Sequence, residues 1–366
     1  MKKVSVYLRN HIDGPSCYYR VVQFINHIDN VDFKINNALN IHDFRRNMDE
    51  KNRIVKKILQ ALFLLKICIR RYMQIKVDLK KKPDAIIIQR EMFPRVLPKF
   101  FIRMYKKLLS QTTVIWDFDD SILTSGEISR TEWSLLSKYS NKIVATSDYL
   151  LESVQTEKEK KVALPTTDGF CENIDLCDIQ DKRENIFGDT VNLVWIGTHS
   201  NLNNIVKILP QLNKAGLILK QHNKKLELEI VCNVDVPELY AKYDGLNIKF
   251  TFWTRENAQN AILKAHIGLM PIPDNEFSKG KGGFKLVQCI ASGIPVIGSN
   301  VGFNKEIVTS DIGVLIDENE KWGDAVAEFA FNFDKWKKSA LAAQKRYQEK
   351  FSYRASLDYW KRMLAN

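Results

Sequence analysis

Apolar residues recur along this chain in short runs of about four to eight, and each run is bounded by glycine, proline or polar turn residues. Between these runs the apolar spacing is helical. Strands that are apolar throughout, rather than at every second position, are typical of parallel sheets covered by helices on both faces. The predicted strands are Lys3 to Leu8, Asp84 to Gln89, Thr113 to Trp116, Lys142 to Ala145, Val162 to Leu164, Val191 to Ile196, Leu226 to Val231, Ile248 to Phe252, Ile267 to Met270, Ile294 to Ile297 and Val314 to Ile316.

The segments between the strands predict helices and one break in the pattern. Residues 169–190 are polar, charged and weakly patterned, which predicts a linker between two domains. Each half opens with a strand, a glycine turn and a helix, the opening of a Rossmann-like unit. The predicted helices are 17–28, 51–79, 96–109, 149–155, 202–212, 284–291 and a helical C-terminus over 322–364.

These elements predict an α/β protein with two Rossmann-like, doubly wound domains facing across a cleft. The first domain spans residues 1–185, and the second spans residues 190–349. The C-terminal helix, about 350–366, is expected to pack back on the first domain.

Composition agrees with two soluble domains. The 366 residues exceed what one core usually holds, and no apolar run reaches the ~18 residues of a transmembrane helix. The N-terminus MKKVSVYLRN predicts a first strand rather than a signal peptide. Six cysteines without a CxxC pair argue against a disulfide framework and a zinc site, and indicate a reducing cytoplasm.

The formal charge of +12 is concentrated in one segment. Residues 43–82 hold 13 Lys or Arg against 4 Asp or Glu, around the apolar centre ILQALFLLKICI. A basic, very apolar helix over 51–79 suits an anionic membrane surface, although a buried helix with solvated ends explains the leucines equally well. The charge also suits nucleic acid, but no aromatic-interleaved basic surface or known motif supports that partner.

Polar residues follow the predicted strands of the first half. Gln89-Arg90-Glu91 ends one strand, and Asp117-Phe-Asp-Asp120 ends the next. Such carboxylates can hold a divalent metal, orient sugar hydroxyls or cap the following helix. Gly14 lets a ligand approach the first turn and Arg20 lies early in the helix, although a plain turn with a solvated arginine fits equally well.

The second half carries a basic, glycine-rich loop, Lys279 to Gly283, which runs into the helix at Phe284. Backbone N–H groups, the helix dipole and Lys285 together describe an anion site. Gly197 and Thr198 form a second helix N-terminus of this kind. The chain contains no GxxxxGK[ST] and no HExxH, which argues against a P-loop kinase and against zinc chemistry. A diphosphate bound by the second domain and a sugar-like acceptor bound by the first domain favour group transfer from a nucleotide-diphosphate donor.

At this point the sequence resembles the retaining nucleotide-sugar glycosyltransferases of family four, which have the GT-B fold, and in particular their bacterial branch that builds surface polysaccharides. The stretches that carry the resemblance cover nearly the whole chain. They are GPSCYYR (14–20), IIIQRE (86–91), WDFDDSI (116–122), ALPTTD (163–168), LVWIGTHSN (193–201), IGLMPIPDNEFSKGK (267–281) and GFKLVQCIASGIPVIGSNVGFNKEIV (283–308).

By position, the resemblance implies that Lys285 binds the donor diphosphate. Gln288 stands where the family has the glutamate that holds the ribose, and Gly280 stands where it has the preceding glutamate of its paired motif. Thr198-His199 replaces the usual arginine, and Gln89-Arg90 replaces a frequent histidine. Contacts to the donor sugar are then expected from neighbours such as Asp274, Glu276 or Lys279.

The resulting site prediction divides the residues by role, with no metal. The catalytic residues are Arg90, Asp119 and Asp120, and the donor-binding residues are Gly14, Arg20, Gly197, Thr198, Lys279, Lys285, Gln288 and Glu306.

The resemblance implies a retaining, metal-independent hexosyl- or related glycosyltransferase without a cofactor. It would move sugar from a nucleotide-diphosphate sugar to a glycan or polyprenyl-linked acceptor in capsule or O-antigen (lipopolysaccharide) synthesis. The enzyme is expected in the bacterial cytoplasm, peripheral on the inner face of the plasma membrane through residues 51–79. The alternative is a sugar-nucleotide epimerase of GT-B fold, which needs neither an acceptor nor a membrane helix.

Overall fold

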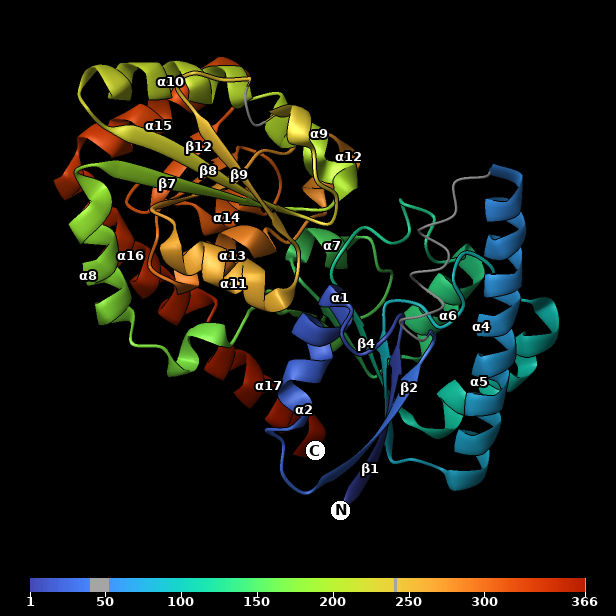
Figure 1. Cartoon of the computed structure of the whole chain (residues 1–366). Coiled ribbons are helices and arrows are strands. Elements are labelled where there is room, and N and C mark those ends of the chain that lie inside the picture. The colour runs from blue at the N-terminus through green and yellow to red at the C-terminus, as the bar shows by residue number, and fades with distance from the viewer. Residues whose placement is uncertain (40–52, 240–241, 366) are drawn as a thin grey trace. The chain divides into compact units, whose positions relative to one another are not determined.

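The computed structural model describes residues 1–39, 53–239 and 242–365. The chain forms two compact units (Figure 1). The N-terminal unit comprises Met1–Thr166 and Ser356–Asn366, and the C-terminal unit comprises Thr167–Ala355. Each unit is a parallel sheet covered by helices, as the continuous apolar runs predict.

The N-terminal unit contains a six-stranded sheet in the order β2-β1-β3-β4-β5-β6. All of its strand pairs are parallel, so their carboxyl ends share one edge. The order changes direction between β1 and β3, and ligands gather at such a point in open α/β sheets. The strands are β1 (Lys2–Leu8), β2 (Val31–Asn37), β3 (Ala85–Gln89), β4 (Thr113–Phe118), β5 (Lys142–Ala145) and β6 (Lys161–Ala163).

Helices cover both faces of this sheet. Ile75, Tyr105 and Trp133 bring three helices, α4, α5 and α6, into one core with alternate strand residues. On the α2 side, the rings of Phe24 and Trp360 lie 6.5 Å apart, which joins the last helix to this unit (Figure 1). The helices and single turns are α1 (Pro15–Cys17), η1 (Tyr18–Val22), α2 (Gln23–Ile25), α4 (Arg53–Lys81), η2 (Lys99–Phe101), α5 (Ile102–Gln111), α6 (Arg130–Tyr139), α7 (Asp148–Glu152), η3 (Lys158–Lys160) and α17 (Tyr353–Ala365).

The C-terminal unit repeats the plan with a second six-stranded parallel sheet, ordered β12-β11-β10-β7-β8-β9. Here the change of direction falls between β7 and β10. The strands are β7 (Thr190–Ile196), β8 (Lys225–Cys232), β9 (Asn247–Phe252), β10 (Ile267–Met270), β11 (Val296–Ser299) and β12 (Gly313–Ile316).

Two cores lie on the two faces of the second sheet. One packs α10 and α15 against β7 and β8, and the other packs α11, α13 and α16 against the opposite side. The helices and single turns are η4 (Phe170–Asn173), α8 (Leu176–Phe187), η5 (His199–Asn201), α9 (Leu202–Val206), α10 (Leu209–Gln221), η6 (Pro237–Leu239), α11 (Arg255–Lys264), α12 (Glu276–Lys279), α13 (Phe284–Ala291), α14 (Asn304–Ile307), η7 (Asn319–Lys321), α15 (Trp322–Phe331) and α16 (Phe333–Lys350).

The predicted α/β class is confirmed, and each predicted strand has a counterpart. The predicted linker is wrong, because residues 169–190 contain helix α8. Asp175 caps α8 by accepting from the N–H groups of Cys177 and Asp178. Helix α8 buries Arg183 and Phe187, and Arg183 donates to the carbonyls of Leu263 and Ser292. Because a buried position of this helix is occupied by an arginine, apolar spacing did not predict the helix. Residues 167–185 belong to the C-terminal unit.

Two further elements were not predicted. Strand β2 alternates polar residues such as Asp32, Lys34 and Asn36, as an edge strand with one open face can. Helix α6 does carry a start signal, since Ser129 accepts from the N–H of Glu132. The helix predicted over 51–79 is α4, with residues 51–52 outside the described part.

Throughout the described part of the chain, every helix is too short or too polar to cross a membrane.

Candidate functional site

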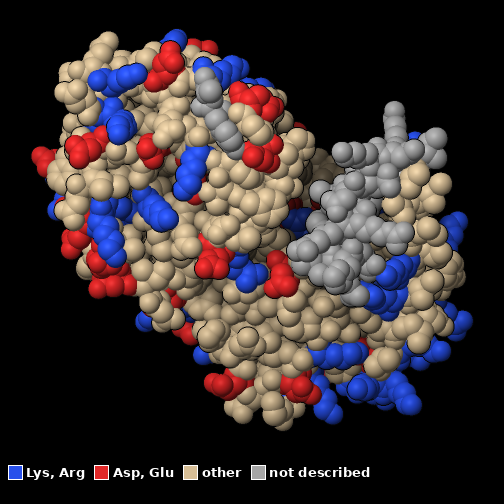
Figure 2. Space-filling view, viewed as in Figure 1, with Lys and Arg blue, Asp and Glu red and all other residues tan. Residues whose placement is uncertain are grey.

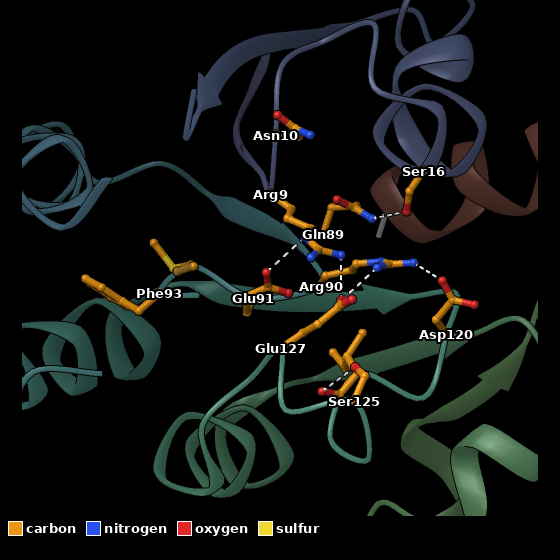
Figure 3. A network of polar contacts seen from close by, with 12 residues as sticks. Arg9, Asn10, Ser16, Gln89, Arg90, Glu91, Phe93, Asp120, Ser125 and Glu127 are labelled. Atoms are coloured by element: carbon orange, nitrogen blue, oxygen red, sulfur yellow. Dashed lines mark hydrogen bonds and ion pairs between the residues drawn. The ribbon is translucent and has the colours of Figure 1, made fainter. Parts of the chain in front are cut away.

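One arginine, Arg90, organises the carboxyl edge of the N-terminal sheet. It follows β3 with a positive φ of 62°. Its Nε lies 2.6 Å from Asp119 Oδ1. Its Nη1 lies 2.9 Å from Glu127 Oε2, and its Nη2 pairs with Asp120 (Figure 3). The structure therefore brings the three predicted catalytic residues together and adds a fourth, Glu127, from the loop after β4.

The two aspartates of this cluster differ in how easily they hold a proton. Burial would raise the pKa of Asp119, but Arg90 and the Ser16 hydroxyl, 2.7 Å away, lower it. Burial raises the pKa of Asp120 to about 6, and this side chain is 32% exposed. Asp119 is therefore a fixed anion, whereas Asp120 can exchange a proton near neutral pH with a hydroxyl at the sheet edge.

A second ion pair in this unit is closed to solvent. Arg20 is 2% exposed, and its Nη2 lies 2.5 Å from Asp117 Oδ1 while its Nη1 donates to the carbonyl of Leu164. Burial raises the pKa of Asp117, against the pull of Arg20. Gly14 accepts from the N–H of Tyr18 in the turn before this helix. Of the two predicted donor-binding residues, Arg20 holds the first helix against β4, and Gly14 is the N-cap of α1.

In the C-terminal unit, two glycines shape the basic loop before α13. Gly283 is the N-cap of α13 with φ 61°, and a Cβ there would lie 2.3 Å from Ile307 Cδ1. Gly302 has φ 53°, and a Cβ there would lie 2.5 Å from the Lys279 carbonyl oxygen. Both positions favour glycine, which lets the loop pass close to the turn after β11.

The same loop reaches the turn after β7. Lys281 Nζ lies 3.1 Å from Asn201 Oδ1, and Asn201 donates to the exposed Thr198 hydroxyl. The N–H of Gly197 donates to the carbonyl of Val231, which extends the pairing of β7 with β8. The two helix N-termini that the sequence marked as anion sites are therefore linked through Lys281, which the site prediction omitted although its GKGG context indicates it.

Lys285 belongs to a three-residue polar chain. Its Nζ lies 3.1 Å from Gln288 Oε1, and Gln288 Nε2 donates to Asp168 Oδ2 at 2.7 Å. Gln288 and Asp168 are buried, while Lys285 is partly exposed. Burial lowers the pKa of Lys285 to about 8 and raises that of Asp168. Lys285 is thus a cation at neutral pH whose direct hydrogen-bond partner is an amide.

This chain also explains why position 288 is an amide. A glutamate there would place a second buried carboxylate against Asp168, and like charges at this distance cannot both ionise. Gln288 instead donates to Asp168 and accepts from Lys285. Asp168 was visible in the motif ALPTTD, but its contact with α13 spans 120 residues of sequence.

The remaining predicted donor-binding residues lie at the surface of the same unit. Lys279 pairs with Glu276 at 2.7 Å. Glu306 is exposed on α14, and its carbonyl accepts from Arg346. Glu276 and Glu306 stay candidates for ligand contact.

A cavity of about 290 Å³ opens at the carboxyl ends of β10, β11 and β12. Asp274, Asn300 and Lys207 give it polar walls, and Trp322 closes it below. Asp274, one of the expected sugar contacts, therefore lies in a recess with hydroxyl-binding groups.

One further polar residue, His266, has a structural role. His266 accepts from the N–H of Asn192 and bonds the carbonyl of Arg183, and burial lowers its pKa to about 4, so it is neutral. Within residues 1–39, 53–239 and 242–365, no group of three or more His, Cys, Asp or Glu side chains is arranged to hold a metal ion.

Comparison with solved structures identifies the class of fold. The whole chain matches the whole of Anabaena HepE, in a complex with UDP and glucose, at TM-score 0.65 and 10% identity. A glycosyltransferase from Rickettsia africae matches at TM-score 0.62 and 13% identity, over 99% of this chain and 97% of its own. A candidate UDP-N-acetylglucosamine 2-epimerase from Listeria monocytogenes matches at TM-score 0.59 and 10% identity, over 98% and 94%. The protein has the GT-B fold.

The sequence adds a family match within that fold. Residues 190–331, which lie within the C-terminal unit, match the family model described as glycosyl transferases group 1. This range contains the basic loop, α13 and the turn after β7. No curated protein matches the chain.

Proposed function

We propose that the protein is a glycosyltransferase that uses a nucleotide-diphosphate sugar as donor. The observation that carries the proposal is the chain of contacts around α13. Lys281 reaches the turn after β7, and Lys285 lies in the first turn of α13, where the helix dipole adds positive potential. The match of residues 190–331 to group 1 glycosyl transferases covers the same elements.

In this proposal the diphosphate binds at the carboxyl edge of the C-terminal sheet. Lys285 is the main contact, with Lys281 and the hydroxyl of Thr198 beside it. As the sugar–phosphate bond breaks, negative charge grows on the leaving diphosphate, and fixed cations and helix N–H groups stabilise it. Lysines and a helix terminus supply here the charge that a metal ion supplies in other transferases, so we propose a metal-independent reaction without a cofactor.

The acceptor is assigned to the N-terminal unit. Asp120 is the most exposed aspartate of the Arg90 cluster and can orient an acceptor hydroxyl, with Asp119 held as an anion beside it. We propose that the sugar is transferred with retention, the donor phosphate itself helping to deprotonate the acceptor. No covalent nucleophile is then needed.

The biological setting is the finer part of the proposal. A glycan or polyprenyl-linked acceptor in bacterial capsule, O-antigen or similar surface-polysaccharide synthesis fits the resemblance of the sequence motifs. Such an acceptor places the enzyme in the cytoplasm, peripheral on the inner face of the plasma membrane. The α4 helix, which is basic and exposed on one side, supports this location.

A sugar-nucleotide epimerase is the second candidate, supported by the Listeria structure of the same fold. An epimerase binds the same diphosphate but converts the sugar nucleotide without an acceptor. The two candidates therefore share the Lys285 site and differ in their product.

The test is a panel of nucleoside diphosphates and sugar nucleotides, screened first by thermal shift. A ligand that binds the native state raises the midpoint by mass action. The stabilising sugar nucleotide is then incubated with and without extracted lipid-linked glycans. A transferase releases nucleoside diphosphate with the acceptor, whereas an epimerase changes the sugar without it. Stabilisation by no member of the panel would contradict the proposal.

A further inference from the structure

Helix α4 has two unlike faces. One face is buried and includes Ile67, Arg71 and Ile75. The opposite face carries large apolar residues at spacings of three and four, which form one continuous stripe along the helix. The outward stripe consists of Val55, Ile58, Leu62, Leu65, Ile69, Met73 and Val77, all of them exposed.

A second segment extends this apolar surface. Phe100 is 76% exposed and Val96 is 61% exposed, just before α5. The Phe100 ring contacts Phe101, whose ring lies 5.4 Å from Tyr72 of α4. The Val96–Phe100 segment is therefore connected to helix α4 through aromatic contacts. Exposed apolar surface of this extent on a folded protein indicates a binding surface.

The surroundings of this surface are positively charged. Residues 53–81 contain nine Lys or Arg and residues 93–112 contain five, whereas the two segments together contain a single acid, Asp78. Asp78 is buried and bonded to Tyr7 and Lys34. Figure 2 shows Lys and Arg gathered over α4 and α5. The exposed cations include Lys57, Lys66, Lys76, Lys80, Lys81, Arg95, Lys99, Arg103, Lys106 and Lys107.

We propose that the outward stripe of α4, together with Val96 and Phe100, docks the N-terminal unit flat on an anionic lipid surface. The stripe enters the acyl boundary, and the surrounding lysines and arginines contact the lipid phosphates. Lys and Arg on the flanks can extend their charged ends to the phosphates while their stems lie along apolar surface. The inference adds a partner to the proposed transferase and assigns it to particular residues.

The positive charge around the stripe favours lipid over a second copy of this chain, and the shape of the stripe disfavours a soluble partner helix. A second copy of this chain would set two surfaces of the same sign against each other, which disfavours pairing. A soluble partner helix needs a groove, but the stripe is the convex side of a single helix. An anionic bilayer matches both the apolar stripe and the charge around it, and the α4 helix lies within the ~20 to 30 residues typical of interfacial helices.

The test is flotation of the full chain with vesicles of phosphatidylcholine alone and of phosphatidylcholine mixed with phosphatidylglycerol. We expect binding to the mixed vesicles only. The combined variant Leu62→Gln, Leu65→Gln and Ile69→Gln should lower the partition coefficient on the order of tenfold or more, because three apolar side chains no longer enter the lipid. The matched control Leu217→Gln, Ile218→Gln and Leu341→Gln removes exposed apolar residues from helices of the C-terminal unit and should float like the wild type.

A second variant separates charge from apolar contact. Lys76→Gln, Lys80→Gln and Arg103→Gln should weaken binding on the order of tenfold or more in low salt. Equal binding to neutral vesicles, no binding to either vesicle, or full binding by the Leu62 variant would overturn the proposal. So would a wild-type dimer that fails to float and that the Leu62 variant converts to monomer. Thermal shift with nucleotides on the same variants should match the wild type, so a failure of docking stays distinct from a failure of the transferase proposal.

Discussion

The carboxyl edges of the two sheets are built on one plan but carry opposite chemistry. In the N-terminal unit, Asp119, Asp120 and Glu127 converge on Arg90, and Asp117 is closed off by Arg20. In the C-terminal unit the edge carries Lys281, Lys285, glycine turns and amides. At the edge of the N-terminal sheet, the carboxylates are therefore paired with arginines of the protein itself. At the edge of the C-terminal sheet, Lys281 and Lys285 carry positive charge.

This difference separates stability from binding. The Arg90 cluster is internally paired, so its removal leaves carboxylates without a counter-charge, and the cost appears in folding. Lys285 is hydrogen-bonded to the amide of Gln288, which leaves its charge for a ligand. Substitutions at the first edge should mainly change stability, and substitutions at the second should mainly change nucleotide affinity.

The largest effect is expected at Arg90. Arg90→Met leaves Asp119, Asp120 and Glu127 without their shared cation, and breaking a buried pair in this way costs about 3–5 kcal/mol. The measurement is urea unfolding at neutral pH. The matched control is Arg95→Met, because Arg95 is exposed and also has a positive φ, 64°. An equal loss in both variants would show that the ion pairs of Arg90 contribute nothing.

A smaller effect is expected at Gln288. Gln288→Glu sets two buried carboxylates together at Asp168, which we expect to cost about 1–3 kcal/mol of unfolding free energy at pH 8. At pH 5 the pair can share one proton, so most of this loss should disappear. Adding Asp168→Asn should also restore stability, because an amide again faces a carboxylate. The exposed control Gln348→Glu should stay near the wild type at both pH values. A Gln288→Glu protein as stable as the control at pH 8 would exclude the proposed repulsion.

A third stability effect concerns Glu91. Neither of its carboxylate oxygens accepts a hydrogen bond in the described structure, and burial raises its pKa from 4.5 to about 7 although Arg9 lies 3.1 Å away. A raised pKa means that the folded state holds the proton more tightly than the unfolded state. The stability from Glu91 is therefore complete below pH 4.5 and is lost as pH rises towards 7.

Glu91→Gln should remove this pH dependence. Relative to the wild type, the variant should gain stability between pH 5 and pH 8, by at most about 1.4 kcal/mol per pH unit. Thermal melts of both proteins across this range measure the gain. A constant difference between the two proteins at every pH would contradict the assignment.

The sequence predicted the sheets because their strands are apolar along their whole length, so β5 and β10 were placed to the residue. It did not reveal α8, since only Phe187 of the two side chains that the helix buries is apolar, and the other is Arg183, which donates to backbone carbonyls. Arg90, Asp119 and Asp120 could be predicted to lie together, because the carboxyl ends of parallel strands meet at one edge of the sheet. Helix α4 was predicted as apolar almost all round, and only its packing separates the core face from the outward stripe.

Other contacts of the site depend on long-range folding. The link between Asp168 and Gln288 joins residues 120 positions apart, and the pairing of Glu127 with Arg90 depends on the path of a loop. The spacing of residues along the sequence therefore could not predict either contact. The sequence did mark Gln288 as a departure from the family pattern, and the reason for that departure became visible only with Asp168 beside it.

The most direct test of the central claim is titration calorimetry of nucleoside diphosphates into the wild type, Lys285→Ala and Lys214→Ala. Lys214 is an exposed lysine on α10, away from the basic loop, and serves as the control. We predict that at least one nucleoside diphosphate binds the wild type and the control alike, and that Lys285→Ala weakens this binding about tenfold or more, with an unchanged melting temperature in the absence of ligand. Equal affinity in Lys285→Ala and Lys214→Ala would contradict the assignment of the positive edge as the donor site.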